Sequence, residues 1–398
     1  MMTNWRLISS ALLNVVPLPV VGYLLGQNWL TVLLVAGFLP LADVVIGKDR
    51  SNPSRVEEAR LLRNPQALRL SRLGLYAYVP VHVALIAWGA WVFAHGQLPA
   101  GQSFGLLLSV GLVTGGQGIT IAHELGHSRS GMDRLLARLL LVFVGYGHFY
   151  IEHNRGHHAR VATPDDPATS RLGESLYRFL PRAIIGSLAS AWRLEAERLR
   201  RRRQDVINVR NQMLWLTGAP LLVAFAISTV LGAPGLLFFA GQCVVAFTLL
   251  EAVNYVEHYG LLRGRTSGGT PERVSFRHSW NASERLSNML LFNLQRHADH
   301  HANPTRPYST LRHREESPQL PTGYPGMLLL ALVPRLWFHV MDSKVVRMRT
   351  TMANAPERKG MREVGSSIDR QPESENVKCH PSPTRSLPAA PNCVVGRN

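Results

Sequence analysis

The chain has 398 residues, of which 46% are hydrophobic, and 43 basic against 26 acidic residues give it a formal net charge of +17. Long apolar runs alternate with stretches dense in arginine and histidine, a pattern that argues against two ordinary soluble domains. The three cysteines, Cys243, Cys379 and Cys393, include no C-x-x-C pair. This excludes a disulfide framework and a thiolate-bound iron–sulfur or zinc module.

Six apolar segments are long enough, or nearly so, to cross the ~30 Å hydrocarbon core of a bilayer. They lie near residues 6–26, 28–47, 76–95, 103–122, 213–232 and 235–254. A cleaved signal peptide is not expected, because no lone apolar stretch follows a polar n-region or precedes an A-x-A-like cleavage site. The sequence therefore predicts an all-α, polytopic membrane protein with six transmembrane helices.

The segments divide the chain into five predicted parts. We expect two transmembrane hairpins in residues 1–122, a cytoplasmic insertion at 123–212 and a third hairpin at 213–254. The insertion includes a buried or interfacial helix at 135–150 and a surface helix at 192–206. Residues 255–345 predict a histidine-rich cytoplasmic cap, with an amphipathic stretch at 325–341 on the membrane surface. We expect a disordered tail at 346–398, which is polar and aperiodic from about 352 onward.

The distribution of basic residues predicts the orientation of the chain. The short connections near 26–28, 96–102 and 232–235 contain no Lys or Arg, whereas the 48–75 connection contains seven. By the positive-inside rule, both termini and the basic regions face the cytoplasm, as in a bacterial inner membrane. No nucleic-acid-binding motif is present, and no nucleic-acid partner is predicted. The run "RLRRRR" (198–203) fits either anionic lipid or an acidic electron carrier.

Four short boxes contain nine of the 16 histidines: "HELGH" (123–127), "EHNRGHH" (152–158), "EHYG" (257–260) and "HADHH" (297–301). Histidines three or four residues apart lie on one face of a helix, where their rings reach one point. Neutral imidazole suits Fe, Zn or Cu, and nine nitrogens exceed the six positions of an octahedral ion. The boxes therefore predict a two-metal cage on the cytoplasmic side. Its candidate ligands are His123, His127, His153, His157, His158, His258, His297, His300 and His301.

Each box also brings an acidic or amide side chain that could orient a ligand by hydrogen bonding: Glu124, Glu152, Asn154, Glu257 and Asp299. Direct ligation by a carboxylate is equally compatible with the spacing. The histidines outside the boxes are predicted not to bind metal, and His148, just before the second box, is the nearest of them in sequence.

Two other classes of protein fit the boxes less well. A membrane zinc protease would use "HELGH" and leave the other seven box histidines without a role. A metal transporter would place polar ligands inside its apolar spans. Here the histidines cluster at or beyond the span ends, which favours an enzyme.

Together, "HELGH", "EHNRGHH", "NYVEHYGL" and "LQRHADHH" resemble the bacterial membrane alkane 1-monooxygenases, or alkane hydroxylases, of the fatty-acid desaturase/hydroxylase superfamily. The likeness extends into "GYGHFYIEHNRGHHARVATPDDPATSRLGES" and "PTGYPGMLLLALVPRLW" and covers roughly residues 5–345. The histidine boxes alone indicate a membrane di-iron protein, a class that includes the desaturases. The "HYG" and "LQRH" elements narrow the resemblance to the alkane branch.

The resemblance implies a six-helix membrane protein whose nine matching histidines hold two iron ions, a non-haem diiron centre. It implies terminal hydroxylation of medium- or long-chain n-alkanes to 1-alkanols with O2. Electrons are then expected from NAD(P)H through a rubredoxin reductase and a separate rubredoxin, because Cys379 and Cys393 cannot form a four-thiolate iron site. A fatty-acid desaturase and an aromatic-methyl hydroxylase are the alternatives within the superfamily.

Overall fold

A computed structural model describes residues 15–353 of the chain. Within this range the regular elements are all helices, and no β-strand occurs there, which confirms the predicted all-α class. The first elements are α2 (Pro17–Leu24), α3 (Leu30–Leu33), the π-helical η1 (Leu34–Phe38), α4 (Leu39–Ile46), α5 (Arg55–Arg63), α6 (Pro65–His95), α7 (Ala100–Val113), the π-helical η2 (Thr114–Gly118), α8 (Ile119–Gly126) and α9 (Gly131–Phe143).

The second half begins with three short elements and continues into two long helices. In chain order it contains α10 (Phe149–Ile151), the π-helical η3 (Glu152–His157), α11 (His158–Arg160), α12 (Leu176–Arg201), α13 (Gln212–His258), α14 (Arg285–Leu290), α15 (His297–Ala302), the 3-10 helix η4 (Tyr308–Thr310), α16 (Tyr324–Ala331) and α17 (Pro334–Ala353).

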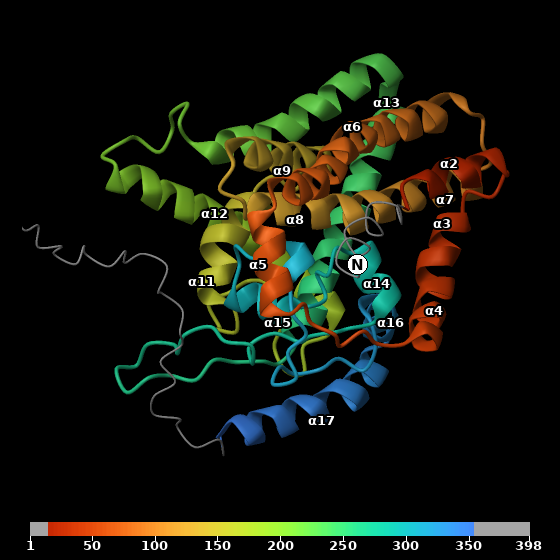
Figure 1. Ribbon diagram of the computed structural model, residues 1–398. Helices are drawn as coiled ribbons and strands as arrows, with labels where there is room; N and C mark the ends of the chain where they lie inside the picture. Colours follow the sequence, from red (N-terminus) through yellow and green to blue (C-terminus); the bar gives the residue numbers. More distant parts are fainter. Residues whose placement is uncertain (1–14, 354–398) are drawn as a thin grey trace, which may run out of the picture. The chain divides into compact units, whose positions relative to one another are not determined.

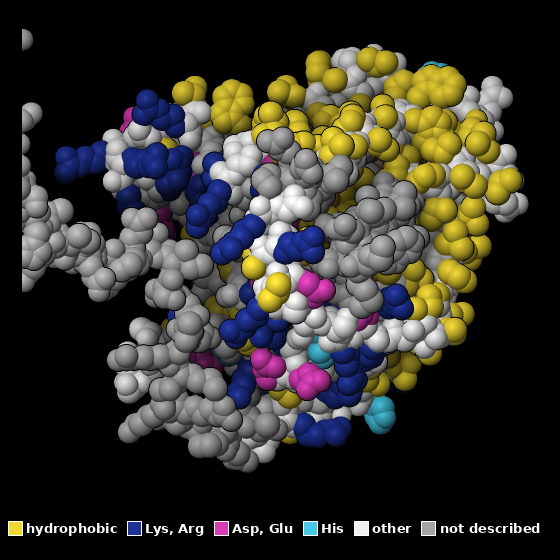
Figure 2. Space-filling view, viewed as in Figure 1, with side chains coloured by type: hydrophobic (Ala, Val, Ile, Leu, Met, Phe, Trp, Pro, Cys, Tyr) yellow, Lys and Arg dark blue, Asp and Glu magenta, His cyan; other side chains and the backbone are white. Residues whose placement is uncertain are grey.

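Three helical stretches of the described residues are long and apolar enough to cross a membrane: Arg72–His95 in α6, Ala100–Gly126 through α7, η2 and α8, and Gln212–His258 in α13. Leu30–Ile46 forms a shorter apolar helix. α13 packs against both α6 and α7. Figure 2 shows hydrophobic side chains gathered over the part of this face where α2, α6, α7 and α13 lie in Figure 1. The chain is therefore a helical membrane protein.

α13 consists of two arms that meet at Gly232. This residue has φ 67° and ψ −162°, a backbone conformation that glycine adopts without the steric cost of a Cβ atom. The arms, Gln212–Leu231 and Ala233–His258, correspond to the predicted helices at 213–232 and 235–254. Along the first arm, large apolar side chains such as Leu221 and Phe225 are exposed, as expected for a surface in contact with lipid.

The other predicted segments differ from the observed helices mainly at their ends. The 28–47 segment is helical from Leu30 to Ile46, whereas most of the 6–26 segment lies outside the described residues. The 103–122 segment runs from Ala100 to Gly126, so the first histidine box continues the same helix instead of starting a separate insertion. The candidate metal-binding side chains therefore begin on a helix that is long and apolar enough to cross a membrane.

The predicted start of the tail at residue 346 is wrong, because α17 remains helical to Ala353. Val345 is fully buried, and the Arg349 Nη2 donates a 2.6 Å hydrogen bond to the carbonyl oxygen of Gly260. These contacts fasten the last helix to the loop that follows α13. The remainder of the predicted tail, residues 354–398, lies outside the described residues.

A buried carboxylate joins η3, α12 and the start of α13. Glu195 on α12 is fully buried and accepts hydrogen bonds from Arg155 Nη1 at 2.8 Å, Arg198 Nη2 at 2.6 Å and the Gln212 backbone N–H at 2.9 Å. Burial raises the pKa of the Glu195 carboxyl, but these hydrogen bonds outweigh burial and lower the pKa to about 2. The ionised carboxylate therefore stabilises the fold around η3.

The lowered pKa of Glu195 predicts a pH-dependent stability. Relative to an ordinary value of 4.5, the ionised group contributes up to about 3 kcal/mol above that pH. The contribution is lost as the pH falls from about 4.5 towards 2. We expect Glu195→Gln to lower the Tm of the detergent-solubilised protein at pH 7, with a gap to wild type that narrows below pH 4.5, as measured by scanning fluorimetry.

The matched control is Glu197→Gln on the same helix. The Glu197 side chain is 54% exposed and lies 4.0 Å from Arg201, an exposed pair that contributes about 0.5 kcal/mol or less. Equal Tm values for the two variants at pH 7 would contradict the assigned role of Glu195.

Candidate metal centre

The nine box histidines converge into two groups. Each histidine offers one ring nitrogen, and within each group all of these nitrogens lie within 4.8 Å of one another. The five-histidine group contains His123, His127, His153, His158 and His300, and the four-histidine group contains His157, His258, His297 and His301. Residues far apart in the sequence thus form two adjacent clusters of ring nitrogens, the arrangement that the sequence predicted for a two-metal cage.

Membrane helices and short cap helices each supply part of the cluster. α8 carries His123 and ends just before His127, while α13 ends at His258. η3 and α11 supply the second box, and α15 supplies the fourth. Figure 1 shows α8, α11 and α15 close to one another near the lower end of the second arm of α13. The cluster therefore forms where two candidate membrane spans end.

The second box does not follow the predicted spacing rule. His153 and His157 are four residues apart and were expected to reach one point, but they belong to different groups. η3 is π-helical rather than α-helical, and its wider turn changes the angle between residues four apart. In the α-helical boxes, His123 and His127 share one group and His297 and His301 share the other. His300 of the fourth box nevertheless belongs to the five-histidine group, so a box can contribute to both groups whatever its helix type.

The distances between ring nitrogens test whether a metal ion fits. His153 Nε2 lies 3.0 Å from His127 Nε2, and His301 Nε2 lies 2.9 Å from His297 Nε2. Ligands about 2.1 Å from an octahedral ion are separated along each edge by about 3.0 Å. Facing lone pairs of neutral rings repel unless a cation lies between them. The donor set and its spacing therefore fit a metal centre.

The protonation state of the cluster also suits metal binding. Burial, followed by the neighbouring histidines, lowers the pKa of His153, His158 and His300 well below the ordinary value. The same causes lower the pKa of His297 and His301. These rings are therefore neutral at pH 7, and neutral imidazole is the form that binds metal.

Two side chains that the sequence analysis missed fix the orientation of ligands in the four-histidine group. His157 Nδ1 lies 2.9 Å from Asp166 Oδ2, which also accepts a 2.6 Å hydrogen bond from Thr169. Burial raises the pKa of Asp166, but the adjacent His157 and Thr169 more than offset it, so the pKa is lowered. Ser279 Oγ lies 3.4 Å from the Nδ1 of His258.

The signal for Asp166 was present in the sequence. It stands in "TPDDPATS", a loop that directly follows the second box, and carboxylates commonly accept the outer N–H of a metal-bound histidine. Ser279 had no comparable signal, because a serine 21 residues after His258 can be placed beside it only by the fold.

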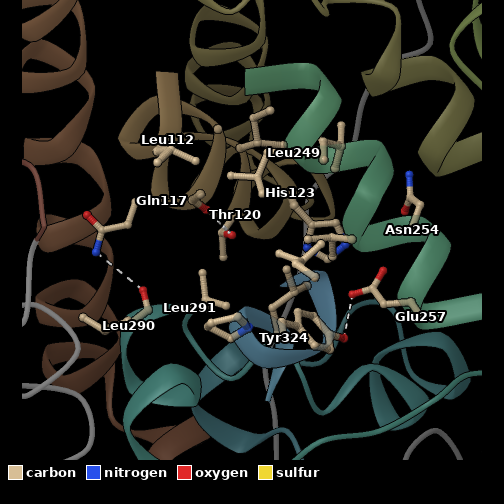
Figure 3. A pocket seen from close by; sticks show the side chains of 18 of the residues that line it. Leu112, Gln117, Thr120, His123, Leu249, Asn254, Glu257, Leu290, Leu291 and Tyr324 are labelled. Atoms are coloured by element: carbon tan, nitrogen blue, oxygen red, sulfur yellow. Dashed lines mark hydrogen bonds between the residues drawn. The ribbon is translucent and has the colours of Figure 1, made fainter. Parts of the chain in front are cut away.

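Among the five predicted orienting residues, Glu257 contacts a box histidine. Its Oε2 lies 3.1 Å from His297 Nε2, and its Oε1 accepts a 2.7 Å hydrogen bond from the Tyr324 hydroxyl. Figure 3 shows this pair beside the apolar cavity described below. A carboxylate thus faces the same space as the four-histidine group.

The other four predicted orienting residues contact partners other than histidines. Glu124 accepts from the Tyr308 backbone N–H at 3.2 Å, Glu152 accepts from Arg160 at 2.6 Å, Asn154 donates to the Tyr150 carbonyl at 2.8 Å, and Asp299 accepts from Arg314 at 2.8 Å. These contacts hold the elements that carry the boxes. His148 is buried with its ring against Tyr146 and belongs to neither group, whereas His380 lies outside the described residues.

An apolar cavity of about 120 Å³ leads to the histidines from within the helix bundle. At one end its lining includes His123 and His153 of the five-histidine group and His297 of the four-histidine group. Leucines such as Leu112, Leu249 and Leu291 line much of the rest, as Figure 3 shows. The cavity therefore brings a hydrophobic molecule against both groups of histidines.

Comparison with known proteins agrees with this geometry. The sequence pattern of the family described as fatty acid desaturase matches residues 99–330. Alkane 1-monooxygenase 2 of Pseudomonas aeruginosa is 46% identical over 80% of this chain and 84% of its own length. Alkane 1-monooxygenase 1 of Alcanivorax borkumensis is 41% identical over 82% of each chain.

A more distant relative is the hydroxylase component of the xylene/toluene monooxygenase of Pseudomonas putida, 30% identical over 82% of this chain and 85% of its own length. The relatives named for alkanes are thus more similar to this chain than the one named for aromatic hydrocarbons. The chain belongs to the fatty acid desaturase family and, within it, to the alkane 1-monooxygenases.

Proposed function

We propose that this enzyme hydroxylates the terminal methyl group of medium- or long-chain n-alkanes at a non-haem diiron centre. The balanced reaction consumes one alkane, O2, two electrons and two protons, and yields one 1-alkanol and one water. The observation that carries the proposal is the apolar cavity that leads to nine converging imidazoles. Similarity to proteins named alkane 1-monooxygenase supports the choice of substrate.

The two groups of histidines supply the two iron sites in this proposal. The five-histidine group would hold one ion and the four-histidine group the other, with Glu257 beside the second. When bound, the irons would supply the oxygen chemistry, which amino-acid side chains cannot perform on an unactivated methyl group. Glu124, Glu152, Asn154 and Asp299 would act by holding the surrounding elements in place.

The chain's own residues bind and orient the alkane. The apolar lining, which includes Leu112 and Leu249, favours a hydrocarbon over water by burying its surface. An extended alkane then enters methyl-first towards His123 and His297. The Tyr324 hydroxyl donates a hydrogen bond to Glu257 Oε1, which leaves Oε2 facing the four-histidine group.

We further propose six membrane spans in a bacterial inner membrane, with both termini and the histidine-bearing cap in the cytoplasm. The two arms of α13 supply two spans, α6 and the α7–α8 stretch supply two more, and Leu30–Ile46 belongs to the first hairpin. The basic residues of the 48–75 connection support this orientation. Electrons would come from a separate rubredoxin and its NAD(P)H-dependent reductase.

Removal of the carboxylate beside His157 provides a test of the four-histidine site. We expect Asp166→Asn to lower iron affinity by about 10- to 100-fold, because a neutral amide accepts the His157 N–H less strongly. The readout is iron retained by the purified protein against increasing chelator. Asp165→Asn, at the exposed neighbouring position, is the control and should match wild type; an Asp166→Asn variant that also matches wild type would refute this role.

The function itself is tested by product analysis. Membranes containing the protein, supplied with rubredoxin, its reductase, NADH and a ladder of n-alkanes, should yield 1-alkanols that are detected by gas chromatography. His297→Ala should abolish the product and reduce bound iron, whereas His339→Ala, an exposed histidine of α17, should retain both. Alkenes would instead assign a desaturase, and turnover of methylbenzenes alone would assign an aromatic-methyl hydroxylase.

A further inference from the structure

A second cavity, of about 390 Å³ and lined with polar side chains, reaches the five-histidine group from another side. It lies between the part of α6 that carries Arg72 and Leu75, the turn that joins α8 to α9, and the loop before η4. We refer to it as the polar hollow. Its lining includes His127, Arg129 and Thr305, and it shares no lining residue with the apolar cavity.

The polar hollow meets the histidine cluster at one of its two half-buried members. Of the nine box histidines, His127 and His158 are half-buried and the other seven are buried. His127 lines the hollow, so a molecule that enters the hollow approaches a candidate ligand directly. The hollow is therefore one way by which a molecule from outside can approach the five-histidine group.

The positive charge at the rim of the hollow favours an acidic binding partner. The acids of the lining are engaged inside: Glu124 accepts from the Tyr308 backbone N–H at 3.2 Å, and Asp133 lies 3.8 Å from Arg72. Arg129 is exposed and forms no ion pair with the described part of the chain. A negatively charged surface would thus meet an uncompensated guanidinium.

We propose that the polar hollow, with Arg129 at its rim, is the docking surface for a small acidic protein that carries one electron at a time. The inference rests on the proposed function, in which each alcohol formed requires two electrons. Two such carriers would be oxidised per turnover, and His127 lies on the side from which their electrons would reach an ion held by the five-histidine group. The alkane and the electron carrier then approach the metal centre from different sides and do not compete.

The basic run at the end of α12 is the competing surface. Its Arg198 is already engaged by Glu195 at 2.6 Å, but Arg201 is 83% exposed. Arg129→Glu and Arg201→Glu therefore form a matched pair of charge reversals, one on each surface. Thr305→Trp, at an exposed position in the lining of the hollow, blocks the hollow without changing charge.

The experiment measures the Kd of purified rubredoxin for the full-length protein in lipid nanodiscs, at low and high salt, and therefore needs no turnover. We expect Arg129→Glu to raise Kd about tenfold at low salt and less at high salt, where charges are screened. Thr305→Trp should raise Kd at both salt concentrations. Arg201→Glu should change it by less than about twofold. Scanning fluorimetry establishes that each variant is folded.

Three outcomes would overturn the proposal. Unchanged Kd for both Arg129→Glu and Thr305→Trp would place docking elsewhere, and a large rise with Arg201→Glu would assign it to α12. An unchanged Kd for Thr305→Trp, with equal loss of alcohol formation driven by rubredoxin or by reduced methyl viologen, would make the hollow a route for water and protons. A wild-type protein that binds rubredoxin at Arg129 but yields no alkanol would refute the proposed function and leave the docking surface intact.

Discussion

The packing of nine imidazoles against one another, seven of them buried and two half-buried, is the constraint on which the rest of the structure depends. A neutral imidazole has two polar ring nitrogens, and burying either of them without a hydrogen-bond partner costs free energy. Their ring nitrogens face one another at separations of about 3 Å, where two nitrogens repel unless one of them carries a proton or a cation lies between them. A cation shared by each group would remove both penalties, so the fold favours a metal centre at this point.

Other features of the fold serve this arrangement. The first and third boxes lie on the ends of α8 and α13, long helices whose packing fixes where their last turns point. The second and fourth boxes lie on short elements, whose few helical hydrogen bonds do not fix their position. Buried polar contacts with neighbouring elements fix it instead. Arg155, two residues after His153, forms an ion pair with Glu195, and Asp299, next to His300 in the sequence, forms an ion pair with Arg314. A substitution at these positions would displace candidate ligand histidines, although the substituted residue is not itself a candidate ligand.

The sequence was sufficient to predict the helical class, the candidate ligands and the helices around Gly232, because periodicity and spacing are local properties. It was insufficient wherever the outcome depended on a contact between distant segments. Asp166 and Ser279 orient ligands only because loops fold back onto the cluster. Spacing also does not reveal that the second and fourth boxes each contribute histidines to both groups. Glu257 faces a histidine while Asp299 faces arginines, a difference decided by the packing of α13 and α15.

The most direct test of this account is the Mössbauer spectrum of the purified full-length protein loaded with 57Fe, together with its iron content. The account predicts two irons per chain in two distinguishable environments of equal population, one for the five-histidine group and one for the four-histidine group. A folded protein that holds a single iron per chain, or that binds zinc in preference to iron, would contradict it.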